Sequence, residues 1–64
     1  MTQKELLYLE DATCHEQSII SILEDSIEKL EDDNLKEFIQ EELDKHNGIK
    51  ENLLNLLEEN ANEW

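Results

Sequence analysis

Residues 16–46 have the sequence EQSIISILEDSIEKLEDDNLKEFIQEELDKH, in which an acidic tetrapeptide, residues 31–34, separates two apolar patterns. On both sides of the tetrapeptide, apolar residues recur three or four positions apart. This spacing is typical of one face of an amphipathic helix, whereas a half-buried strand alternates apolar and polar residues strictly. Because the tetrapeptide breaks the apolar phase, the stretch predicts two helices joined by a short turn.

The two apolar stripes extend outward from this stretch along both halves of the chain. The first half carries Tyr8, Leu9, Ala12, Ile19, Ile22, Leu23, Ile27 and Leu30, and the second half carries Leu35, Phe38, Ile39, Leu43, Ile49, Leu53, Leu56 and Leu57. Ile20, Ile27, Leu54 and Leu57 fall at the margins of these stripes. An acidic disordered segment has no reason to keep one helical phase over several turns, so the pattern favours a folded chain.

Residues suited to capping a helix precede both stripes. Thr2 followed by Glu5 has the spacing of a capping box, in which each side chain satisfies a free backbone N–H of the other residue. Asn34 followed by Glu37 has the same spacing. We therefore expect Thr2 and Asn34 to cap the two helices.

The predicted helices cover about residues 2–30 and 34–60, and so short a turn makes them antiparallel, as an αα-hairpin. Gly48 interrupts the second half, but the heptad phase continues across it, so we predict one uninterrupted helix. The last residues, up to Trp64, are expected to fray. Residues 1–64 are predicted to form a single domain, because two domains would each be too small to enclose a core.

Both stripes are wider than the seam that two helices bury between them. Chains this short generally need a further source of stability, and one cysteine excludes an internal disulfide framework. We therefore expect a homodimer in which two hairpins form an all-α four-helix bundle. The residues expected in its apolar interface are Leu9, Ala12, Ile19, Leu23, Ile27, Ile39, Ile49, Leu53 and Leu56.

The charge of the chain excludes several classes of function. Eighteen Asp and Glu against five Lys and Arg give a formal charge of −13, which argues against nucleic-acid binding and against docking on an anionic membrane. No apolar run is long enough for membrane insertion, and the N-terminus lacks a signal-peptide pattern, so we expect cytoplasmic synthesis. No nucleophile triad or glycine-rich phosphate loop is present, so we predict no catalytic residues, no cofactor and no enzyme activity.

Four polar residues interrupt the apolar stripes near the middle of the two predicted helices: His15 and Glu16 in the first, and Glu42 and His46 in the second. In an antiparallel hairpin, facing positions sum to about 65, which places His46 within one helical turn of Glu16. One interpretation is a polar layer that sets the register of the helices and the choice of partner. The other is a metal site formed by these four residues, whose carboxylates and imidazoles suit Fe, Mn or Zn.

The segments that carry these residues, Glu16–Leu23, Asp33–Leu35 and Glu41–His46, resemble one half of a ferritin-like protein. The resemblance implies that Glu16 and His46 stand at metal-ligand positions. Leu43 stands where the family has a glutamate, three residues before the histidine, and Glu42 is one position away.

A narrower resemblance covers about residues 3–57. The segments Lys4–Leu7, Glu10–Ala12, Leu35–Phe38 and Lys45–His46 resemble the spore coat F-like family of small ferritin-like helical proteins from endospore-forming bacteria. This resemblance implies a non-catalytic structural role in sporulation, deposition on the spore coat and other coat proteins as partners. Two alternatives stay open, namely a metal-binding or oxidative protein, and an acidic adaptor for a basic partner protein.

Cys14 lies at the margin of the first stripe, next to His15. A cysteine in this position is most often a small half-buried apolar residue. The functional alternative is an intermolecular cross-link between coat proteins.

Overall fold

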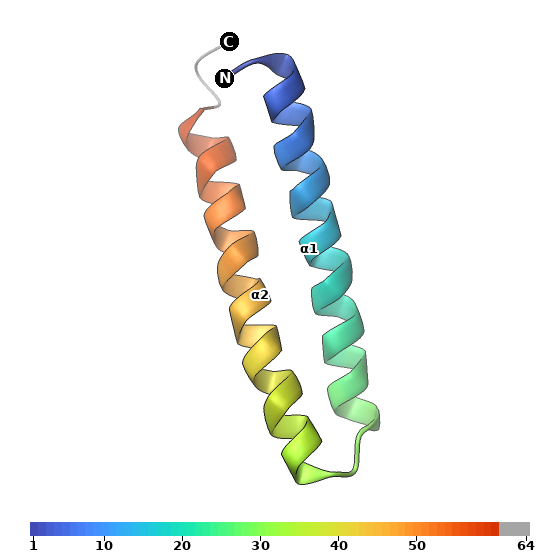
Figure 1. The fold of residues 1–64 in the computed structure, drawn as a ribbon. Helices are drawn as coiled ribbons and strands as arrows, with labels where there is room; N and C mark the ends of the chain where they lie inside the picture. Colours follow the sequence, from blue (N-terminus) through green and yellow to red (C-terminus); the bar gives the residue numbers. More distant parts are fainter. Residues whose placement is uncertain (61–64) are drawn as a thin grey trace.

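The computed structural model describes residues 1–60, which form two antiparallel helices, α1 (Gln3–Lys29) and α2 (Asp33–Glu59). The hairpin measures 48 × 14 × 11 Å, with the turn at one end and the start of α1 beside the end of α2 at the other (Figure 1). The predicted all-α hairpin is confirmed. The expectation for Trp64 and its neighbours lies outside the described residues.

The N-terminus of α1 has the predicted capping box. Thr2 Oγ1 accepts a hydrogen bond of 3.0 Å from the Glu5 backbone N–H, and Glu5 Oε1 accepts one of 2.7 Å from the Thr2 backbone N–H. The bonds to the Thr2 backbone and side chain hold the pKa of the Glu5 carboxyl below its ordinary value of 4.5, because they favour the ionised form. The box therefore fixes where α1 begins.

The turn between the helices differs from the prediction at one residue. The Leu30 backbone N–H donates to Ser26 O at 3.0 Å and ends α1. Asp32 is the N-cap of α2, since its Oδ1 accepts a 3.0 Å hydrogen bond from the Leu35 N–H. The prediction of Asn34 as the cap is wrong, because the backbone is extended at Asp32 (φ −76°, ψ 122°) and already helical two residues later.

α2 passes through Gly48 without interruption, as predicted from the heptad phase. No residue of the described part of the chain has a positive φ, so Gly48 is helical and does not act as a cap. Neither described helix is apolar enough along its length to cross a membrane.

The seam between the helices is only partly shielded from water. It is formed by residues three or four apart: Leu6, Leu9, Thr13, Glu16, Ile20, Leu23, Ile27 and Leu30 of the first half, and Ile39, Leu43, His46, Lys50, Leu53 and Leu57 of the second. Within residues 1–60, only Ile20 is fully buried, at 3% exposure. Placing Ile20 at the stripe margin was therefore wrong, because it lies at the centre of the seam.

Candidate functional site

Three polar side chains form a cluster across the middle of the seam. The Nδ1 atom of His46 lies 2.6 Å from Glu16 Oε2, and its Nε2 atom lies 3.8 Å from Glu42 Oε2. Glu16 is on α1, whereas Glu42 and His46 are one turn apart on α2. The structure thus brings together three of the four polar residues that the sequence singled out, and we call them the Glu–His–Glu cluster.

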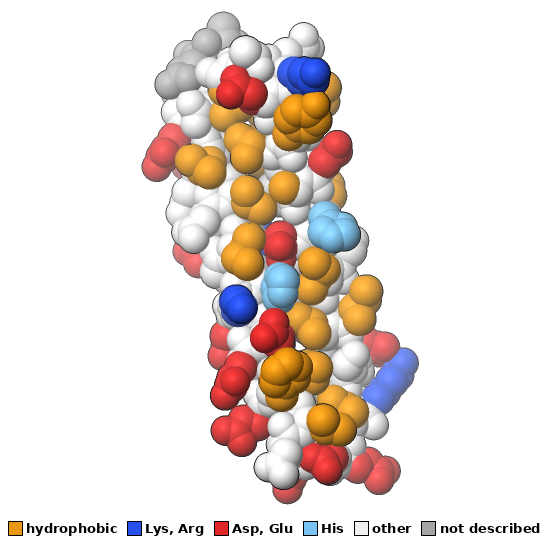
Figure 2. Space-filling view, viewed as in Figure 1, with side chains coloured by type: hydrophobic (Ala, Val, Ile, Leu, Met, Phe, Trp, Pro, Cys, Tyr) orange, Lys and Arg blue, Asp and Glu red, His pale blue; other side chains and the backbone are white. Residues whose placement is uncertain are grey.

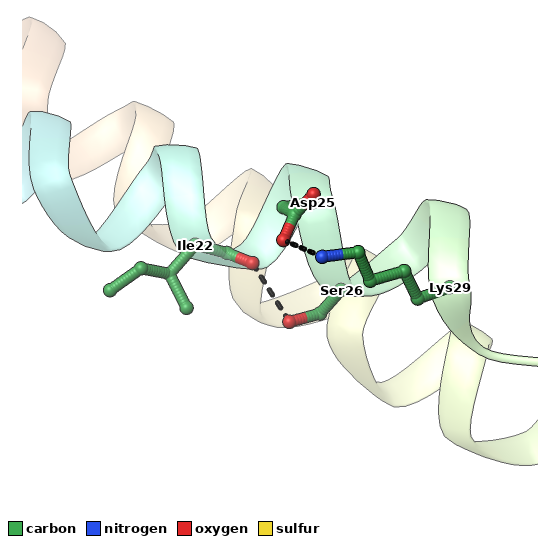
Figure 3. A network of polar contacts seen from close by, with 4 residues as sticks. All are labelled: Ile22, Asp25, Ser26 and Lys29. Atoms are coloured by element: carbon green, nitrogen blue, oxygen red, sulfur yellow. Dashed lines mark hydrogen bonds and ion pairs between the residues drawn. The ribbon is translucent and has the colours of Figure 1, made fainter.

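Both side chains of the Glu16–His46 contact are largely shielded from water. The side chains of Glu16 and His46 are 14% and 22% exposed, and the Glu16 carboxylate accepts the hydrogen bond from the imidazole. An exposed pair on α1 gives the contrast: Lys29 Nζ lies 2.7 Å from an Asp25 carboxylate oxygen, and both side chains are more than half exposed (Figure 3). Such surface pairs contribute only about 0.3–0.5 kcal/mol, so the shielded contact is the one that distinguishes this hairpin.

The cluster contains donor types that suit Fe, Mn or Zn, but its geometry does not fit a single ion. Glu16 faces one ring nitrogen of His46 and Glu42 faces the other, so the two carboxylates lie on opposite edges of the imidazole. No group of three or more His, Cys, Asp or Glu side chains within residues 1–60 is arranged to hold a metal ion. His15 is exposed and is not hydrogen-bonded to the cluster.

Apolar side chains run along most of one face of the hairpin and are interrupted near its middle by acidic, basic and histidine side chains (Figure 2). The large apolar side chains of this face are Tyr8, Ile22, Leu35, Phe38, Ile49 and Leu56, which are 37–65% exposed. Their spacing places them on one side: Tyr8, His15 and Ile22 follow each other every seven residues on α1, as do Leu35, Glu42, Ile49 and Leu56 on α2. We call this surface the apolar face; both histidines are visible on it.

The predicted interface residues divide between the seam and the apolar face. Leu9, Ile19, Leu23, Ile27, Ile39 and Leu53 are half-buried, whereas Ala12, Ile49 and Leu56 are exposed. Sequence reasoning missed the seam residues Leu6, Thr13 and Lys50, the last of which donates a hydrogen bond to Gln17 Oε1 across the seam. The signal that would have found Leu6 is its spacing of three residues from Leu9 and seven from Thr13.

Cys14 is exposed on α1, next to His15. Residues two positions apart point about 200° apart on a helix, so the Cys14 side chain points away from that of Glu16 in the cluster. The structure therefore places the thiol where another molecule can reach it and away from the Glu–His–Glu cluster.

The fold and the site define a class of protein: a helical hairpin with one shielded polar contact in its seam and an unpaired apolar face along its length. No family model, curated protein or solved structure matches this chain. Its function is therefore inferred from the residues and contacts described above.

Proposed function

We propose that the protein is a small, non-catalytic structural protein that acts by self-association, two hairpins pairing through their apolar faces into a ferritin-like four-helix bundle. The observation that carries this proposal is the imbalance of burial. One residue of the described chain, Ile20, is fully buried, while six large apolar side chains are exposed on one face. A hairpin with so little core gains stability only by covering that face.

The size of the apolar face supports pairing with a second copy. The hairpin extends 48 × 14 Å on its broad side, so a second copy of the same shape can cover the apolar face along its length. Burying its six large side chains removes apolar surface from water at about 25 cal/mol per Å². The face extends over both helices, as a layer of a four-helix bundle requires.

The position of the Glu–His–Glu cluster also supports self-pairing. The cluster lies near the middle of the hairpin, so a two-fold axis through the centre places each polar cluster opposite its own copy and apolar ends opposite apolar ends. The net charge of −13 opposes association. The central residues 13–21 and the residues level with them, 44–52, however, carry three carboxylates against two lysines, so net charge and repulsion are lower there than toward the ends.

The biological setting of this proposal comes from the resemblance to the spore coat F-like family. We propose that the protein is synthesised in the cytoplasm and is a coat or assembly component of an endospore, with other coat proteins as its further partners. The exposed Cys14 supports this setting, because a thiol on the outside of a bundle is accessible for a cross-link between bundles.

The test compares two substitutions that add the same charge one residue apart. Ile22→Glu places a carboxylate on the apolar face, where Ile22 is 65% exposed, whereas Ser21→Glu places it on a neighbouring exposed position. Light scattering against protein concentration should show a dimer for the unchanged protein and for Ser21→Glu, and a monomer for Ile22→Glu. A 7.6 kDa monomer for all three would refute self-association.

A metal-binding or oxidative function is the second candidate, and the observation that favours it is the proximity of Glu16, Glu42 and His46. Binding of Fe, Mn or Zn would require the His46 ring to leave one of its two carboxylate neighbours. Elemental analysis and Fe(II), Mn(II) and Zn(II) titrations test this function directly. Stoichiometric binding that His46→Ala abolishes and His15→Ala preserves would replace the structural proposal.

A further inference from the structure

Charged side chains lie at both ends of the apolar face, and Lys29 at the turn end is ion-paired with Asp25 of its own helix. Lys29 follows Ile22 by seven residues and so extends the line of Tyr8, His15 and Ile22 to the turn end of the hairpin. At the open end, Glu5 precedes Ala12 by seven residues, and Glu59 follows Phe38 by three heptads. The rim of the face therefore has a lysine near the turn and glutamates near the open end.

Two face-to-face arrangements satisfy a two-fold axis, and they place these charges differently. In a parallel pair, turn lies on turn, α1 packs on α2 of the partner, and Glu5 meets the partner's Glu59 at the same height. In an antiparallel pair, turn lies on open end and α1 packs on α1 of the partner. Lys29 then faces the partner's Glu5, because positions on the two α1 helices sum to about 34 around an axis near the Glu–His–Glu cluster.

The total charge of the two ends favours the same arrangement. Residues 22–44, at the turn end, carry ten carboxylates against two lysines, whereas residues 1–12 and 50–60, at the open end, carry six against two. Packed helices lie about 8–10 Å apart, near the screening length of ~8 Å, so charges on facing ends repel. A parallel pair stacks the two more acidic ends on each other, whereas an antiparallel pair separates them by nearly 48 Å.

The polar cluster does not choose between the arrangements, since a central layer meets its own copy in both. The charged rim does choose. Given the proposed self-association, we infer that the two hairpins pack antiparallel, with Lys29 of each copy opposite Glu5 of the other and the Glu–His–Glu clusters adjacent to the two-fold axis. The apolar face thus binds the second copy, and the charges at its rim set one orientation for that copy.

The test measures the distance between two turns in the dimer. A spin label at Glu31→Cys in a Cys14→Ser background reports the position of the turn, because residue 31 is exposed and lies in the segment that connects α1 to α2. Double electron–electron resonance should give a single distance close to the 48 Å length of the hairpin. A parallel pair would give a distance within about 20 Å, two interhelical spacings.

Two controls separate this inference from the proposed function. Light scattering on the labelled protein shows whether a dimer is present, and a monomer would contradict the self-association itself. The second control is a spin label on the native Cys14, which lies close to mid-hairpin. The two labels of a dimer should then lie at nearly the same height along the hairpin axis in either arrangement. A dimer with the short turn-to-turn distance, or with both distances, would overturn the antiparallel orientation while leaving the self-association intact.

Discussion

The imidazole of His46 lies 2.6 Å from the carboxylate of Glu16, thirty residues earlier in the chain and on the other helix. In the described part of the chain, two side-chain hydrogen bonds join α1 to α2, and the second, between Lys50 and Gln17, is exposed. The Glu16–His46 bond is therefore the shielded polar connection that accompanies the apolar seam.

Removing one partner of this bond should cost more than removing both. His46→Leu leaves the Glu16 carboxylate, 14% exposed, without its imidazole, and the free energy of unfolding should fall by about 1–3 kcal/mol. The double variant Glu16→Leu/His46→Leu replaces the pair with apolar contacts and should unfold within about 1 kcal/mol of the unchanged protein, or be more stable. Urea unfolding at one fixed protein concentration measures both, since association contributes to stability.

The exposed Asp25–Lys29 pair is the matched control for this experiment. Asp25→Asn should change the free energy of unfolding by no more than about 0.5 kcal/mol, because both side chains of the pair are in contact with water. A loss of stability at His46→Leu no larger than the loss at Asp25→Asn would show that the Glu16–His46 bond contributes no more than an exposed surface pair.

Ile20 should be the most sensitive apolar position of the seam. Ile20→Ala removes buried atoms from a site 3% exposed and should cost about 2–5 kcal/mol, which is most of the stability expected of so small a domain. Its exposed neighbour provides the control: Ser21→Ala should change stability by less than about 0.5 kcal/mol. Thermal unfolding followed by circular dichroism measures both, and similar effects at the two positions would contradict the assigned seam.

The start of α2 can be tested at the two residues that compete for the cap. Asp32→Ala removes the side chain that accepts from the Leu35 N–H and should cost about 1 kcal/mol. Asn34→Ala changes a residue inside the first turn of α2 and should leave stability nearly unchanged or slightly raised. Chemical denaturation distinguishes the two, and a larger cost at Asn34 would restore the sequence-based assignment.

Gly48 should tolerate a larger residue. A Cβ atom added at this position meets nothing within 4 Å, and the backbone there is already helical. Gly48→Ala should therefore stabilise the hairpin by up to about 1 kcal/mol through the higher helix propensity of alanine. A raised unfolding midpoint in urea is the expected readout, whereas destabilisation would indicate a neighbour at position 48 in the assembled protein.

The capping box of α1 predicts a dependence on pH at the acid end. The pKa of Glu5 is lowered in the folded state, so the contribution of its carboxylate to stability is present above the unfolded pKa and is lost as the pH falls through the folded one. An NMR titration of the Glu5 side-chain carboxyl carbon should give a pKa below 4.5, and Thr2→Ala should move that pKa upward. A Glu5 pKa at or above 4.5 would show that the box is absent in solution.

The two helices and their turn were predictable because apolar periodicity and the Thr2–Glu5 box agree about where α1 lies. The N-cap of α2 was not, because Asp32, Asp33 and Asn34 all suit a cap and the backbone angles alone select among them. The proximity of Glu16 to His46 followed from the antiparallel register, since helical rise and turn position fix which residues are level.

The centre of the seam was harder to predict than its existence. In α1, the line through Ile20, Leu23 and Ile27 and the line through Tyr8, Ala12 and Ile22 are both largely apolar, so one helix alone does not show which line faces its partner. Only packing against α2 separates them, burying Ile20 and leaving Ile22 exposed. The exposed second line is what the proposed dimer covers.

The most direct test of self-association is the mass of the unchanged protein by sedimentation equilibrium over a wide range of concentration. The proposed pairing predicts a mass of twice the 7.6 kDa chain at high concentration, falling toward the single chain on dilution, with Phe38→Glu shifting that transition to higher concentration. A mass of 7.6 kDa at every concentration, unaffected by Phe38→Glu, would contradict it.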